Sequence, residues 1–176
     1  PDLERTNQLI IQRTGSDVTT IPEVANHLIS AGGKRLRPML VLATAGMCGY
    51  KGDGHLKFAA GIEFMHTATL LHHAFKMMVE PGMVPPLTVV SQAAAVIAEG
   101  EILQLNAAKD TTTTEDAYMA VIRRKTAELF AAAAEVGVML AGKPKADEAA
   151  ARSYGMNLGI AFQPVSYTHL TLPTKA

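Results

Sequence analysis

Apolar residues recur at helical spacing along almost the whole chain, and this pattern limits the possible folds more than any other feature. Ile21, Val24, Leu28 and Ile29 follow the spacing, and it returns after Ala117. Such a repeat places apolar side chains on one face of an α-helix. Only 5% of the 176 residues are aromatic and none is Trp, so aliphatic side chains have to build the core. We therefore expect an all-α, single-domain helical bundle.

Segments rich in Gly, Pro, Thr or charge divide this pattern into roughly seven helices. Breaks are expected at 32–33, 49–54, 80–86, 109–113 and 142–144. Two capping boxes predict helix starts, one from Thr20 to Glu23 and one that pairs Thr112 with Glu115. The segment 61–72 is predicted to form one helix.

The charge balance excludes several classes of partner. Lys plus Arg and Asp plus Glu both number 16, so no net field favours nucleic acid or an anionic membrane. The longest apolar stretches are 39–48 and 129–140, the second interrupted by Glu135. Both are shorter than the ~20 residues of a membrane span, and we expect no transmembrane segment. A single cysteine, Cys48, fits a reducing compartment, and we expect a cytoplasmic protein.

Three cations stand between a glycine pair and a proline in the segment GGKRLRP, residues 32–38. Lys34, Arg35 and Arg37 precede Pro38, which suits the first position of a helix. A helix N-terminus, a planar guanidinium and a mobile ammonium together suit a diphosphate. Taken alone, however, three cations in a loop are more often a solvated basic turn.

Two other segments carry polar groups at helical positions. His66 could donate a hydrogen bond to a phosphate oxygen, although a core histidine bonded to a neighbour is the commoner case. Lys125 and Thr126 could hold a second phosphate at the mouth of a cavity between helices. Lys125 could equally extend its charge to solvent from an amphipathic helix.

Taken in order, these segments resemble the trans-isoprenyl diphosphate synthase (polyprenyl synthetase) family, and in particular its octaprenyl and decaprenyl diphosphate synthases. The matching phrases are GGKRLRPML, EFMHTATLLH, AAVIAEGEILQL, RRKTAELFAAAAEVG and YGMNLGIAFQ. The resemblance implies a helical bundle around a central cavity, usually in a homodimer. It also implies a prenyltransferase that condenses isopentenyl diphosphate with an allylic diphosphate. In the family, two Asp-rich motifs hold the Mg²⁺ ions that this reaction needs.

The resemblance also implies roles for residues at the family's motif positions. The positions that match isopentenyl diphosphate binding are Lys34, Arg37 and His66. The positions near the allylic diphosphate are Lys125, Thr126 and Gln163. The positions in the chain-length pocket are Ala68 and Thr69, whose small side chains favour a long product.

The sequence departs from the family where the Asp-rich motifs belong. The first should follow His72, but the chain reads His73-Ala74-Phe75, and the second should follow Gln163. An Asp-rich motif works because carboxylates one helical turn apart present their oxygens to the same hard cation. The sequence has no such motif elsewhere, since none of its six aspartates is adjacent to another. We interpret residue 73 as the site of an internal deletion. We expect no metal ligand to be retained and the chain to be inactive.

The C-terminal segment 164–176 changes abruptly to β-branched residues and Thr. We predict that Pro164 ends the helix before it, that 1–163 is the synthase-like domain and that 164–176 is a non-native tail on a truncated domain. Two alternatives stay open. One is a non-catalytic helical subunit of a heteromeric prenyl synthase. The other is a carboxylate-bridged metal bundle, indicated by the spacing of Glu63 and His66, although the sequence lacks the second such pair.

Overall fold

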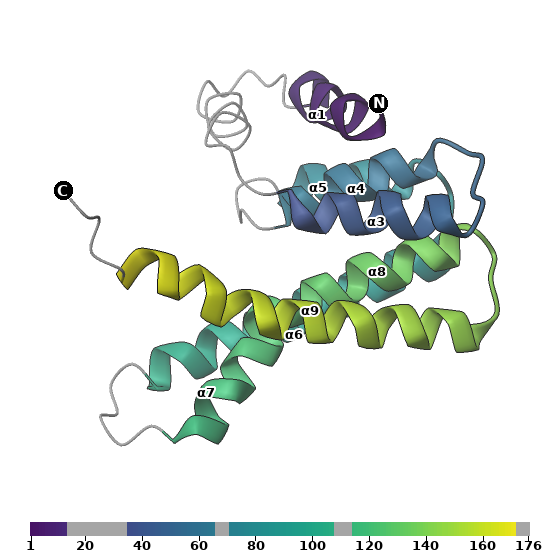
Figure 1. Cartoon of the computed structure of the whole chain (residues 1–176). Helices are drawn as coiled ribbons and strands as arrows, with labels where there is room; N and C mark the ends of the chain where they lie inside the picture. The colour runs from purple at the N-terminus through teal and green to yellow at the C-terminus, as the bar shows by residue number, and fades with distance from the viewer. Residues whose placement is uncertain (14–34, 66–70, 108–113, 172–176) are drawn as a thin grey trace.

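The computed structural model describes residues 1–13, 35–65, 71–107 and 114–171, and every element in these ranges is helical. The elements in chain order are α1 (Asp2–Arg13), α3 (Leu36–Met47), α4 (Gly54–Phe64), α5 (Leu71–Val79), α6 (Val84–Ala107), α7 (Glu115–Ile122), the π-helical η2 (Arg123–Ala127), α8 (Glu128–Leu140) and α9 (Lys145–Thr171) (Figure 1). α7, η2 and α8 run on without a break. The prediction of an all-α fold is confirmed.

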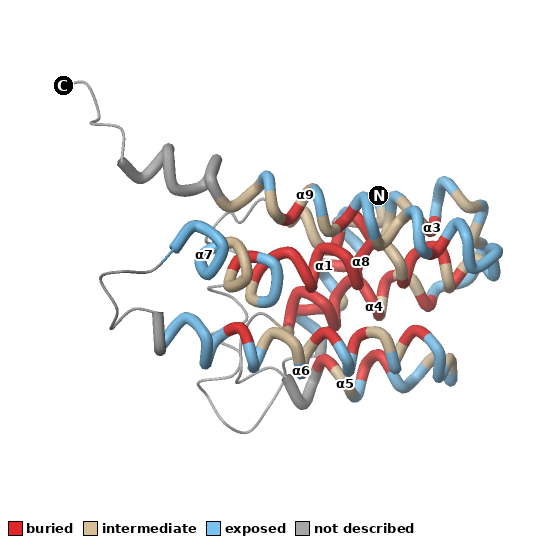
Figure 2. The backbone as a smooth tube through the Cα atoms, turned by 90° about the horizontal axis from the view of Figure 1, so that it is seen from below, coloured by how far each residue is buried: buried red, intermediate tan, exposed pale blue. Residues whose placement is uncertain are grey.

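Helix α8 is the centre of the bundle. It packs against α3, α4, α6 and α9, and nearly all of its residues are buried (Figure 2). Four consecutive alanines, 131–134, are fully buried and let the neighbouring helices approach closely. At Gly137 a Cβ atom would collide with the hydroxyl of Thr44, so the contact between α8 and α3 requires glycine.

Three of the predicted breaks are confirmed, because α3, α5 and α8 end within a few residues of 49–54, 80–86 and 142–144. The predicted cap of α7 is wrong. Thr114, not Thr112, precedes the first helical residue, and its hydroxyl accepts a hydrogen bond from the Ala117 amide at 3.3 Å. Four consecutive threonines each offered a capping hydroxyl, and the one next to the helix is used. The segments 32–33 and 109–113 and the box from Thr20 to Glu23 lie outside the described residues.

The segment 61–72 does not form the single helix predicted for it. α4 ends at Phe64, and α5 begins at Leu71 and runs across residue 73. The two helices pack side by side, and a Cβ on Gly61 would lie 2.6 Å from Cγ of Met78. One continuous helix cannot bring Met78 against Gly61, and the structure buries that contact between two separate helices, so helical periodicity alone gave the wrong boundary.

Pro164 does not end the last helix, because α9 continues to Thr171. A proline inside a helix removes one backbone hydrogen bond and strains the preceding turn, but it does not have to stop the helix.

Earlier in α9, Arg152 joins this helix to α8 through Glu135, at 2.9 Å, and through Glu128. Partial burial lowers the pKa of Arg152, but these two carboxylates outweigh it and raise the pKa above its ordinary value.

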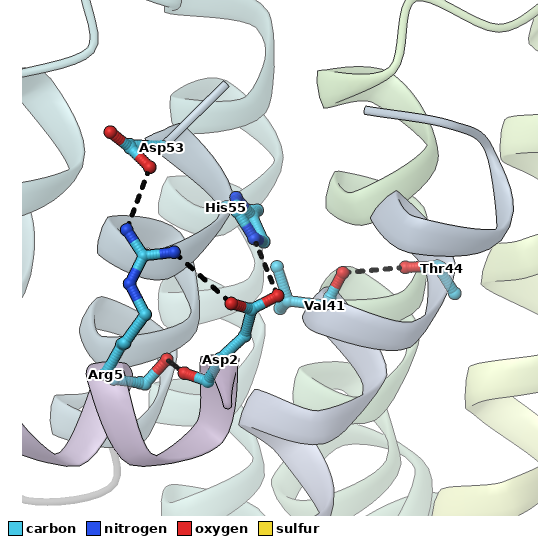
Figure 3. Close-up of polar contacts among 7 residues, drawn as sticks. Asp2, Arg5, Val41, Thr44, Asp53 and His55 are labelled. Carbon is cyan, nitrogen blue, oxygen red and sulfur yellow. Dashed lines mark hydrogen bonds and ion pairs between the residues drawn. The ribbon is translucent and has the colours of Figure 1, made fainter. Parts of the chain in front are cut away.

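Helix α1 is attached to the start of α4 by polar contacts at the surface (Figure 3). Arg5 contacts Asp53 at 3.2 Å, and a carboxylate oxygen of Asp2 lies 3.6 Å from Nε2 of His55. Because Arg5, Asp2 and Asp53 are all about half exposed or more, these pairs orient α1 and add little stability.

One stretch of α6, Val84–Leu105, is long and apolar enough to cross a membrane by length and composition alone. This stretch was not among the apolar stretches singled out from the sequence. Helices of soluble proteins pass the same test, so the finding is weak support for a membrane span. Only 22% of its most apolar window is buried, which leaves Ile102 and Leu105 exposed.

Candidate functional site

The start of α3 holds a buried ion pair. Arg35 directly precedes the helix in the left-handed region, with φ at 48°, and its Nη1 lies 2.6 Å from Oε1 of Glu63 on α4. The two side chains are 9% and 11% exposed. Arg35 was predicted to be one of three cations available to an anion, but in the structure it donates a hydrogen bond to Glu63. Glu63 was not recognised as its partner, because the two residues are 28 positions apart.

Arg37, predicted to bind isopentenyl diphosphate, lies two residues further on in the first turn of α3. Its guanidinium carbon stands 4.9 Å from the ring centroid of Phe130, a cation–π contact with a fully buried ring of α8. Nε of Arg37 is buried and has no hydrogen-bond partner within the described structure. Burial lowers the pKa of Arg37, and the negative charge of Glu63 acts in the opposite direction. The structure therefore holds one guanidinium over the core with donor capacity left.

Pro38 is the third residue of α3, not the first as predicted, because the helix begins at Leu36. The amide that proline lacks at this position would have no partner inside the helix, so the first turn accommodates it. Lys34 and His66, the other two residues assigned to isopentenyl diphosphate, lie outside the described residues, as do Ala68 and Thr69 of the chain-length pocket.

Lys125 and Thr126 lie in η2, the π-helical segment between α7 and α8. Segments of this kind are rare and occur frequently at functional sites, and no local sequence pattern predicted this one. Thr126 is buried at 9% exposure. Lys125 is partly exposed, lies 3.0 Å from the carboxylate of Glu101 and donates a hydrogen bond to Oε1 of Gln104. Both partners belong to α6, so the described polar contacts of Lys125 are made with α6 and not with α3.

Glycine makes this contact between α6 and η2 close. A Cβ on Gly100 would lie 2.7 Å from the amide nitrogen of Lys125. A side chain at position 100 would push η2 away from Glu101 and Gln104. Gly100 therefore allows the close approach of η2 to α6 that lets Lys125 contact these two residues. On the other side of η2, a Cβ on Gly159 of α9 would lie 2.5 Å from Cα of Ala127. η2 is therefore enclosed between α6 and α9.

Gln163, assigned to the allylic diphosphate, lies partly buried in α9. Its neighbour Phe162 packs against Phe130, with ring centroids 5.5 Å apart. The ring of Phe130 also makes the cation–π contact with Arg37. One aromatic ring therefore contacts both the start of α3 and the part of α9 that contains Gln163. The structure thus brings Arg37 near this end of α9 and places Lys125 on the α6 side of η2.

The described residues do not fit a divalent metal ion. In the described part of the chain, no group of three or more His, Cys, Asp or Glu side chains is placed to hold one. Glu63, proposed above as half of a metal-ligand pair with His66, accepts from Arg35 instead. Mg²⁺ requires several oxygen ligands, so no chemical step is assigned to a metal here.

The polyprenyl synthetase family model matches the chain in two parts, residues 18–73 and 73–165. The chain belongs to the polyprenyl synthetase family. Its match with the octaprenyl diphosphate synthase of Escherichia coli K12 is 39% identical over 196 aligned positions, covering 92% of this chain and 61% of that protein.

Solved structures of family members share the fold. A polyprenyl synthase from Caulobacter crescentus, complexed with calcium and isoprenyl diphosphate, gives a TM-score of 0.88 at 42% identity and covers 92% of this chain and 64% of that chain. A decaprenyl diphosphate synthase from Rhodobacter capsulatus gives 0.88 at 44% identity and covers 94% and 63%. This chain therefore spans less than two thirds of the length of each of these relatives.

Proposed function

We propose that this member of the polyprenyl synthetase family binds isopentenyl diphosphate and does not catalyse prenyl transfer. One observation carries the proposal: the buried, partly unsatisfied guanidinium of Arg37 is present, and a carboxylate cluster opposite it is absent from the described residues. A buried donor in an apolar setting binds an anion strongly, because little water competes for it.

The comparisons support an internal deletion at the first Asp-rich motif. The two parts of the family match meet at residue 73, directly after His72, where the motif is expected to begin. The alignment with the Escherichia coli synthase has 196 positions, more than the 176 residues of this chain, so some positions of that relative have no counterpart here.

Loss of the carboxylates removes the chemistry more than the binding. In the family, Mg²⁺ neutralises the charge that develops on the departing diphosphate. Removing a single preorganised charge stabiliser costs about 10²–10³ in rate, and a whole ligand set costs more. What remains is a cation that can hold and orient a diphosphate without assisting its departure.

Two measurements test the proposal. The purified chain, incubated with Mg²⁺, isopentenyl diphosphate and farnesyl diphosphate, is expected to form no polyprenyl product above an enzyme-free control, and any Mg²⁺-dependent product would overturn the inactivity. Calorimetric titration with isopentenyl diphosphate is expected to show binding that Arg37→Met abolishes. Absence of binding to the unaltered chain would overturn the binding.

The roles of Lys34, His66, Lys125, Thr126 and Gln163 are part of the same proposal, with Lys125 and Thr126 on η2 assigned to the allylic side. The long product implied by Ala68 and Thr69, the homodimer and the cytoplasmic location stay predictions. So does the non-native origin of 164–176.

A further inference from the structure

The ion pair between Arg35 and Glu63 has no part in the binding roles assigned so far. We propose that Glu63 is a positioning residue, which fixes the first turn of α3 so that Arg37 lies over Phe130 and is available to an anion. The inference rests on the proposed function, because that function makes Arg37 part of a diphosphate site.

Glu63 lies where an unpaired carboxylate would be strongly unfavourable. It belongs to α4, in which nine of eleven residues are buried, and its own side chain is 11% exposed. The hydrogen bond from Arg35, at 2.6 Å, supplies the compensating charge. Glu63 therefore holds Arg35 in one place.

The conformation of Arg35 passes this constraint on to α3. Arg35 has φ 48° and ψ 29°, a left-handed conformation that is unfavourable for a residue with a Cβ atom. It directly precedes the helix, so its backbone angles set the direction in which the first turn leaves. Arg37 projects from that turn. Holding Arg35 by its side chain thus holds the backbone that carries Arg37.

Glu63 also separates the roles of the two guanidinium groups. It binds Arg35 directly, while its charge acts on Arg37 from a greater distance and favours the charged form of that buried group. Arg37 keeps a buried Nε without a partner among the described residues. The carboxylate therefore engages one arginine and leaves the next to meet the ligand.

The first test needs no ligand. In ¹⁵N-labelled protein, the Nε–H signal of Arg37, assigned by its loss in Arg37→Lys, is expected to be shifted by the Phe130 ring and to exchange slowly. Glu63→Gln is expected to remove the ring shift and to speed exchange about tenfold. The control is Glu135→Gln, which alters a carboxylate of similar burial, 16% exposed, in its contact with Arg152 and leaves the Arg37 signal unchanged. An unchanged Arg37 signal in folded Glu63→Gln overturns the inference.

The second test uses isopentenyl diphosphate as the calorimetric probe. Glu63→Gln removes a negative charge near an anion site, so charge alone predicts tighter binding. Positioning predicts binding weaker by about 10–100-fold, the usual effect of losing a residue that orients a binding group. Equal or tighter binding overturns the inference. Absence of binding to the unaltered chain overturns the proposed function instead, and the ligand-free test still decides the role of Glu63.

A substitution at Glu63 can fail to fold because it removes the carboxylate that Arg35 binds in a buried setting. If Glu63→Gln does not fold, the double variant Arg35→Met with Glu63→Met is measured instead, because it removes both charges of the pair. It is expected to fold and to lose the ring-shifted Arg37 signal. A folded double variant that keeps the signal overturns the inference.

Discussion

Two of the cation-bearing regions, the start of α3 and the segment η2, differ in how far their ion pairs are exposed to water. At α3, Arg35 and Glu63 are 2.6 Å apart and about 10% exposed. At η2, Lys125 and Glu101 are 3.0 Å apart, with side chains 35% and 52% exposed. Water screens the second pair and hardly reaches the first. Two pairs that look equivalent in the sequence are therefore expected to differ several-fold in their effect on stability.

The largest effect is expected from Arg35→Met. It leaves Glu63 buried without its partner and should lower the free energy of unfolding by about 3–5 kcal/mol, measured by urea denaturation. Adding Glu63→Met should recover most of the loss, since no unpaired charge then remains. A loss below about 1 kcal/mol for the single variant is typical of exposed ion pairs. It would show that the Arg35–Glu63 and Lys125–Glu101 pairs do not differ in their effect on stability.

Gly100→Ala comes next, because it tests whether backbone contact rather than charge holds η2. The new Cβ would lie 2.7 Å from the amide nitrogen of Lys125, and the overpacking should cost about 1–3 kcal/mol, partly offset by the better helix propensity of alanine. Thermal unfolding measures the change. In the matched control Gly46→Ala in α3, the Cβ meets nothing within 4 Å, so stability should rise. Equal changes in both variants would refute the close approach.

A smaller effect is expected from Phe130→Leu, which removes the ring between Arg37 and Phe162. The aromatic and cation–π contacts together should be worth about 1.5 kcal/mol. A double-mutant cycle with Arg37→Met isolates the arginine part, expected at about 0.5–1 kcal/mol. If the two variants prove additive, Arg37 does not depend on the ring.

Lys125→Met is expected to have the smallest effect. An exposed pair contributes about 0.2–1 kcal/mol, and 1 M salt, with a screening length of about 3 Å, should abolish it. Urea denaturation at low and high salt measures both values. The loss caused by Arg35→Met should persist in the same salt. A salt-resistant loss at Lys125 would show that η2 is as shielded as α3.

The helical class and three of the breaks followed from local chemistry. Glycine and proline near 49–54, 80–86 and 142–144 end helices through their own backbone preferences, which neighbours in the sequence report. The family resemblance, confirmed by the comparisons, predicted that Arg37 binds isopentenyl diphosphate. The structure shows that side chain over a buried ring, and its binding role stays a prediction.

The errors arose where a distant contact decides the outcome. Arg35 looked like a free cation because its partner Glu63 is 28 positions away. The helix through 61–72 looked continuous because its periodicity is good, but packing Met78 against Gly61 requires two separate helices. The π-helical turn of η2 between α6 and α9 has no local signature at all. These features are set by tertiary packing, which a single sequence does not report.

The wide turn of η2 has a consequence for how the chain tolerates change. A π-helical turn contains one residue more than an α-helical turn of similar length, so it acts as an insertion absorbed inside a continuous helix. Removing one residue from 123–127 would restore an ordinary helix and leave α7 and α8 in register. An ordinary helix at Lys125 and Thr126 would therefore keep α7 and α8 in register, but the close contacts of η2 with Gly100 and Gly159 would have to readjust.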